Sequence, residues 1–116
     1  MTKKPLDKIT AHYRNKISGG LLKVNVPEWD LDIYYRPSNT LQEESRMIEL
    51  TQKGKTVEAL VETLIIRARN EDGTKMFKLA DKGTFMQEVD PQILIRVCGD
   101  MNAQSEDETV ENAIKN

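Results

Sequence analysis

The strongest constraint on the fold is the apolar periodicity of residues 57–68. Apolar side chains recur there at spacings of three and four, at Val57, Leu60, Val61, Leu64, Ile65 and Ala68. This spacing places them along one face of an α-helix. Because so long an apolar face must be covered by other elements, we expect this helix to be the centre of the core.

A second helix is predicted immediately before it. Thr40 and Glu43 have the spacing of a capping box, so a helix should begin at Leu41 and run to about Lys53. The link Gly54-Lys55 is so short that the two helices should form an antiparallel helical hairpin. The side of the earlier helix expected to pack carries four apolar residues, Leu41, Met47, Ile48 and Leu50.

The segment before these helices indicates a β-hairpin. Apolar and polar residues alternate over residues 22–26, and after Pro27-Glu28-Trp29-Asp30 a second run follows at 31–36 that is rich in β-branched and aromatic residues. Two strands alone are marginally stable, so helices should cover one face of the hairpin.

Beyond a turn at residues 70–73, helical spacing resumes, and Pro91 suits the first turn of a last helix that carries Leu94, Val97 and Met101. We therefore predict an α+β fold, mostly α-helical, with an N-terminal β-hairpin packed on a small helical bundle and flexible termini. Residues 21–103 form a single globular domain. Residues 1–20 form a basic, weakly structured segment with one or two amphipathic turns, and 104–116 an acidic, loosely structured tail that forms a short final helix or is disordered.

Composition excludes several function classes. The formal net charge is −2, which gives no general attraction to phosphate backbones and argues against nucleic-acid binding outside the basic start. Cys98 is the only cysteine, so an intramolecular disulfide is excluded and a reducing cytoplasm is favoured. No apolar run reaches the ~18 residues of a membrane span, so we expect a soluble intracellular protein.

Catalytic and metal-binding patterns are missing from the sequence. His12 is the only histidine, and Cys98 falls on the side of the last helix that is expected to be buried. The glycines match no phosphate-binding loop, and the carboxylates Glu43, Glu44 and Glu49 fit a solvated helix face. We predict no enzyme, no small-molecule substrate, no cofactor and no metal.

Partner contacts are the remaining class of site. Trp29 lies at the hairpin tip, and one of the adjacent Tyr34 and Tyr35 must face away from whatever covers the sheet. Met47 and Met86 are adaptable side chains near the expected apolar grooves. The alternative is that Trp29 caps the core, Tyr35 is a half-exposed strand residue and the methionines pack inside. Both interpretations stay open, with these five residues as candidate contacts.

The order of the segments resembles a known family. Residues 24–37 place a valine-rich strand, a Pro-Glu-Trp turn and an aromatic strand ending in Arg36-Pro37 before a capped acidic helix. The apolar helix of residues 57–68 and the turn of residues 70–77, with its Asp72-Gly73 step, follow in the same order. Over residues 21–102 the chain resembles the tail assembly chaperones of long-tailed, siphophage-like bacteriophages.

This resemblance implies a protein of the host cytoplasm, absent from the mature virion, that binds the tape measure protein, keeps it soluble and helps recruit tail tube subunits. Relatives often have a longer frameshifted product, and an extension would attach near Gln104. Self-association stays open. The alternative is a small phage or prophage regulatory protein that binds a host protein or DNA through the basic N-terminus.

Overall fold

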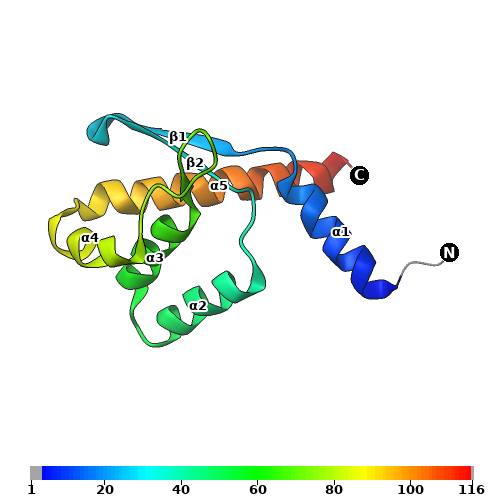
Figure 1. Cartoon of the computed structure of the whole chain (residues 1–116), viewed down its shortest axis with the longest axis horizontal. Coiled ribbons are helices and arrows are strands. Elements are labelled where there is room, and N and C mark those ends of the chain that lie inside the picture. The colour runs from blue at the N-terminus through cyan, green and yellow to red at the C-terminus, as the bar shows by residue number, and fades with distance from the viewer. Residues whose placement is uncertain (1–3, 116) are drawn as a thin grey trace.

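The computed structural model describes residues 4–115, with their side chains as far as Gln104. It measures 54 × 31 × 29 Å along its principal axes (Figure 1). In chain order the elements are α1 (Pro5–Ile17), β1 (Leu22–Val26), η1 (Pro27–Trp29), β2 (Leu31–Tyr35), α2 (Leu41–Gln52), α3 (Thr56–Arg67), β3 (Ala68–Arg69), η2 (Leu79–Asp81), α4 (Lys82–Glu88) and α5 (Pro91–Lys115).

The predicted hairpin is confirmed. Strands β1 and β2 are antiparallel, with Leu22 opposite Tyr35 and Val26 opposite Leu31. Between them lies the short helix η1, which ends at Trp29, and the following Asp30 has a left-handed φ of 52°. A third strand, β3, adds to β2 in the order β1-β2-β3. The sequence did not predict β3, because Ala68 also fits the apolar spacing of the helix before it.

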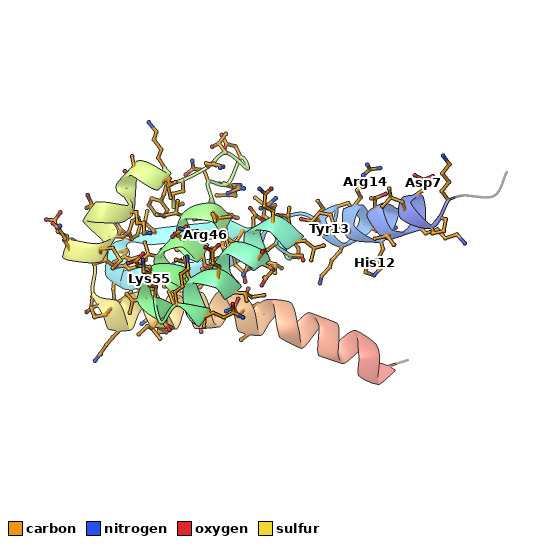
Figure 2. All side chains as sticks on the ribbon, turned by 90° about the horizontal axis from the view of Figure 1, so that it is seen from below. Asp7, His12, Tyr13, Arg14, Arg46 and Lys55 are labelled. Atoms are coloured by element: carbon orange, nitrogen blue, oxygen red, sulfur yellow. The ribbon has the colours of Figure 1, made fainter. Side chains whose placement is uncertain are left out.

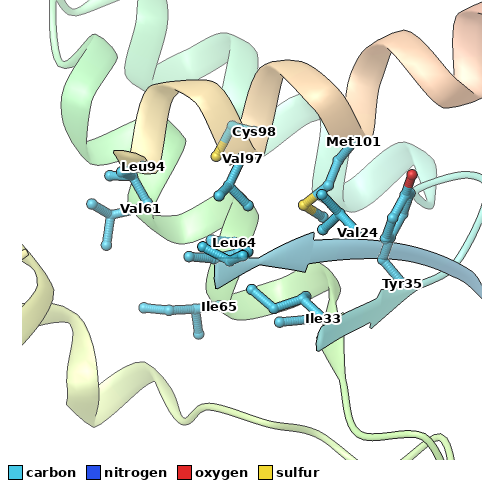
Figure 3. Close-up of a cluster of buried hydrophobic side chains, with 12 residues drawn as sticks. Val24, Ile33, Tyr35, Val61, Leu64, Ile65, Leu94, Val97, Cys98 and Met101 are labelled. Carbon is cyan, nitrogen blue, oxygen red and sulfur yellow. The ribbon is translucent and has the colours of Figure 1, made fainter. Parts of the chain in front are cut away.

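The buried face of the sheet forms one wall of the core. Alternation along the hairpin places Val24, Val26, Ile33 and Tyr35 inside, while Lys23 and Asn25 are exposed. Helices α3 and α5 meet this face with the buried side chains Val61, Leu64, Ile65, Leu94, Val97, Cys98 and Met101 (Figure 3). The core helix of the sequence analysis is thus confirmed, except that Val57 in its first turn is exposed.

An ion pair joins the tip of the hairpin to α5. Arg96 donates to both carboxylate oxygens of Glu28, and the Nη2–Oε1 distance is 2.7 Å. The hydrogen bonds from Arg96 hold the pKa of Glu28 at about 2. The hairpin is therefore attached to α5 at its tip as well as through the core.

Helix α2 begins at the predicted capping box. The Glu43 amide donates to Thr40 Oγ1 at 3.2 Å, and the Thr40 amide donates to Glu43 Oε1 at 2.8 Å. Gly54, with a φ of 76°, ends the helix in the left-handed conformation that glycine tolerates best. The predicted helical hairpin of α2 and α3 is confirmed.

The packing side predicted for α2 is wrong in part. Leu50 is buried and Met47 half-buried, but Leu41 is 90% exposed and Ile48 is 54% exposed. Arg46 forms an ion pair with Glu62 of α3 from the packed side of the helix. Because this contact and Leu50 fix the rotation of α2, the side carrying Leu41 and Ile48 must face outward.

Both ends of the described chain are helical. Residues 5–17, predicted to be weakly structured, form the 13-residue helix α1, which has no buried residue. Helix α5 continues without a break through residues 104–115, where the sequence analysis placed a separate short helix or disorder. The division at residues 20 and 103 stays a prediction. The expectation of flexible termini falls partly on residues 1–3 and 116, which lie outside the described residues.

The capping box gives the first testable prediction. We expect Thr40→Ala to lower the free energy of unfolding by about 1 kcal/mol, because it removes the acceptor for one otherwise unpaired amide. Thr51→Ala is the matched control, since the Thr51 hydroxyl donates only to the Met47 carbonyl within the helix. Urea denaturation of both variants measures the difference. Equal losses would contradict a capping role for Thr40.

Candidate interaction surface

The outward side of α2 forms an exposed apolar ridge. Leu41 and Ile48 are seven residues apart, so they lie on the same helix face, with Ser45 between them and Gln52 beyond them. All four side chains are exposed. We call these four residues the α2 ridge. Two neighbouring large apolar side chains left in water make the ridge a candidate site for a partner.

Carboxylates lie on both sides of the ridge. Glu44 accepts a hydrogen bond of 2.8 Å from the side-chain amide of Asn39. Glu49 forms an ion pair of 2.9 Å with Lys53, and hydrogen bonding to that lysine lowers the pKa of Glu49. The ridge is therefore a narrow apolar strip with a carboxylate on each edge, of which Glu49 is paired with a lysine and Glu44 is not.

A buried carboxylate holds α2 in this orientation. Glu62 of α3 is only 4% exposed and accepts from Arg46 Nε of α2 at 3.2 Å and from Lys82 Nζ of α4 at 2.8 Å. Lys82 also reaches Glu58 at 3.2 Å. Burial raises the pKa of Glu62, but the hydrogen bonds from Lys82 and Arg46 outweigh it and leave that pKa below its usual range. One residue thus connects three helices.

The start of α2 is fixed by the segment before it. Arg36 Nη2 lies 2.9 Å from both carboxylate oxygens of Glu43. Burial raises the pKa of Glu43, but the amide of Thr40 and the charge of Arg36 outweigh burial and lower that pKa. The Arg36 carbonyl in turn accepts from Arg67 at 3.0 Å. The ridge is therefore presented on a helix anchored at its first turn and at its centre.

The aromatic candidates Trp29, Tyr34 and Tyr35 do not gather at one surface. Trp29 is partly buried and packs against the core, as in the core-capping interpretation. Tyr34 is half-buried on the outer face of the sheet. Tyr35 is fully buried, so its interpretation as a half-exposed residue is wrong. Its hydroxyl donates to Gln104, and its ring lies 5.1 Å from the guanidinium carbon of Arg67.

The methionine candidates lie apart from each other. Met47 is half-buried between α2 and α3, and its sulfur accepts a hydrogen bond from Thr63 Oγ1 at 2.8 Å. Met86 is exposed on α4. Of the five candidates, Met47 alone belongs to the helix that carries the ridge. Contact of these five residues with a partner stays a prediction.

Leu41 and Ile48 were not predicted to be surface residues, because every apolar residue of the helix was assigned to one packed side. Leu41 and Leu50 are nine residues apart. At about 100° per residue, this separation puts them on opposite sides of a helix. A helical projection of residues 41–52 therefore contains the signal for a second apolar side.

Chemical groups suited to catalysis are not brought together in the described structure. His12 is exposed on α1, whereas Cys98 is buried in α5 with its Sγ 3.6 Å from the Leu60 carbonyl oxygen. Burial raises the pKa of the Cys98 thiol to about 11. Among the described residues no group of three or more His, Cys, Asp or Glu side chains could hold a metal ion. No described helix is long and apolar enough to cross a membrane.

The Glu62 contacts give a testable prediction. We expect Glu62→Gln to lower the free energy of unfolding by about 1–2 kcal/mol at neutral pH, because Arg46 and Lys82 lose a buried partner but stay partly solvated. The carboxylate has a lowered pKa in the folded state, so its contribution is present above about pH 5 and is lost on acidification. Urea denaturation from about pH 7 to pH 3 should show the two proteins converging.

Glu49→Gln is the matched control, since it removes an exposed ion pair on the same helical hairpin. Its effect should stay below about 0.5 kcal/mol at every pH. A constant difference between wild type and Glu62→Gln across this pH range would contradict a stabilising role for the Glu62 charge.

The fold agrees with a known protein. No protein-family model and no curated protein sequence matches the chain. Among solved structures, it is similar to the tail assembly chaperone of bacteriophage HK97, with a TM-score of 0.57 and 19% identity over 88% of this chain and 93% of that chain. The resemblance inferred from the sequence is thus confirmed at the level of structure: the chain has the fold of a phage tail assembly chaperone.

Proposed function

We propose that the protein is a tail assembly chaperone that binds the tape measure protein, keeps it soluble and helps recruit tail tube subunits. The observation that carries the proposal is the shared fold with the HK97 chaperone over nearly the whole of both chains. The exposed α2 ridge supplies a surface of the kind that such a function needs. In this role the protein acts in the host cytoplasm and leaves before the virion is complete.

The ridge suits a helical client. An amphipathic helix docks through apolar residues spaced by three, four and seven, and Leu41 and Ile48 present the spacing of seven. Met47, on the packed side of the same helix, could add an adaptable contact only at the edge between α2 and α3. Tyr34 and Met86 offer further contacts on other faces, and Trp29 and Tyr35 contribute if the hairpin moves on binding.

The contact at one ridge is weak by itself. Full burial of Leu41 and Ile48 together contributes about 3–6 kcal/mol, whereas association costs about 4–15 kcal/mol in lost translational and rotational freedom. A long client with many similar helices overcomes this limit, because several copies of the chaperone bind along it. We therefore propose that many copies cover one tape measure protein.

A second candidate function rests on α1. The basic side chains Lys8, Arg14 and Lys16 of α1, and Lys4 just before it, form no ion pair with any side chain of residues 4–104. A basic helix of this kind can bind DNA or an acidic host protein. Such binding would weaken steeply as salt is raised, whereas apolar client binding would not.

Co-expression with the tape measure protein of the same genome distinguishes the two functions. A chaperone should make the tape measure protein soluble and co-purify with it at both low and high salt. A tape measure protein that is soluble alone, or insoluble with the chain present, would reject the chaperone function. Loss of the complex at high salt would favour the regulatory protein.

The ridge itself is tested by substitution. We expect Leu41→Asp combined with Ile48→Asp to reduce the co-purified tape measure protein at least about tenfold, because two charges would have to be buried in the contact. Both residues are exposed, so the fold should persist. The matched control is Leu79→Asp, an exposed apolar residue of η2. Equal losses from the ridge and control variants would rule out the ridge as the client site.

A further inference from the structure

A second apolar face lies on α1, exposed at Leu6 and Ile9 and half-buried at Tyr13 and Ile17. Leu6 and Ile9 are both 67% exposed, and together with Tyr13 and Ile17 they follow a spacing of three, four and four. We call these four residues the α1 stripe, since that spacing aligns them along one face of the helix. Helix α1 projects from the body of the molecule (Figures 1 and 2). The chain thus carries two exposed apolar helix faces.

The two faces have opposite charges at their edges. Arg14 and Lys16 lie on α1 and form no ion pair with any side chain of residues 4–104. Beside the α2 ridge, Glu44 is hydrogen bonded to the neutral amide of Asn39 and has no cationic partner among those residues. An unpaired cation on one face and an unpaired carboxylate on the other favour contact between them.

Length and register also match. Helix α1 has 13 residues and α2 has 12, which makes them about 20 Å and 18 Å long. In an antiparallel arrangement with Ile17 beside Leu41, Arg14 comes level with Glu44, and Ile9 comes within one residue of Ile48. The apolar and the charged positions therefore coincide in a single register.

Tyr13 supplies an independent observation. Its hydroxyl is buried, yet it has no hydrogen-bond partner among the described residues. A buried polar group without a partner is unfavourable. In the antiparallel register Tyr13 comes level with Ser45 of the ridge, whose hydroxyl could pair with it.

The connection between α1 and the body allows the movement. Residues 18–21 form it, and Gly20 has a φ of 96°, in a region open to glycine. Leu22 pairs with Tyr35, and α2 begins six residues after Tyr35. Both views place the end of α1 at the same end of the molecule as the start of α2 (Figures 1 and 2). Four residues span up to about 13 Å.

We propose that α1 is a strap that closes over the α2 ridge of its own chain and competes there with the client. The proposed closure is based only on residues of this chain, whereas the competition with a client rests on the proposed function. A tethered helix acts at a high effective concentration, so a client must outcompete it. The strap would keep the ridge out of water until a client with several matching helices arrives.

The first experiment measures closure without any client. Nitroxide labels are placed by His12→Cys and Gln42→Cys in the full chain, in which Cys98 is buried, and their separation is measured by pulsed electron resonance. Closure should give a population at about 20 Å or less, as helices in contact require, beside a longer distance for the open form. Only a long distance would overturn the proposal. So would a short distance that disappears on mixing with unlabelled chain, since that contact would be between molecules.

Charge exchange tests the register in the same assay. Glu44→Lys should reduce the short-distance population by placing a lysine opposite Arg14, and Arg14→Glu added to it should restore that population. A short-distance population unchanged in both variants would overturn the predicted pairing of α1 with the ridge.

The second experiment measures binding to the tape measure protein. Ile9→Asp should open the strap and raise the apparent affinity for the tape measure protein. The expected factor is the inverse of the open fraction in the wild type. It is about twofold if half of the wild-type molecules are closed and about tenfold if nine tenths are closed. Asn15→Asp is the matched control, because it adds a charge to α1 outside the stripe and should leave affinity unchanged. If wild type binds and Ile9→Asp binds no tighter, the competition is overturned. If no variant binds while the short distance persists, the strap stands and the proposed chaperone function fails.

Discussion

Burial of helix α3 is the constraint on which the rest of the structure depends. One side of α3 packs against the sheet and α5, and α2 and α4 lie against other parts of it. A chain of 116 residues forms one small core, and α3 lies at its centre. Helix α2 therefore serves as cover through Met47 and Leu50. Its remaining apolar residues have nothing in the described structure to pack against, so the ridge is a consequence of the small core.

Two buried charges set the rotation of α3. Glu62 accepts hydrogen bonds from α2 and α4. Arg67, five residues later, lies over the ring of Tyr35 in the sheet and donates to Asn102 of α5. Burial lowers the pKa of Arg67, which reflects the cost of placing a guanidinium inside. Rotation of α3 would separate both charges from their partners. These polar contacts give the helix one orientation where apolar packing alone would allow several.

Local signals in the sequence were enough to predict most of the fold. Strand alternation defined the hairpin, Thr40 and Glu43 defined the start of α2, and Gly54 with Lys55 defined the turn into α3. Features that depend on contacts between residues far apart in the sequence could not be predicted. Strand β3 exists because β2 offers it an edge, and the outward rotation of α2 depends on an ion pair between residues 46 and 62. Met47, the predicted contact on α2, therefore lies on the packed side of the helix and not on the ridge.

The burial of Cys98 has a consequence for the chemistry of the chain. With a thiol pKa of about 11, the reactive thiolate is about one part in ten thousand at neutral pH. The native protein should therefore be inert toward oxidants and alkylating reagents, and only molecules in which α5 separates from the sheet would react. The single native thiol is thus a probe of local unfolding. Its rate of alkylation reports how often the core opens, with no label added to the chain.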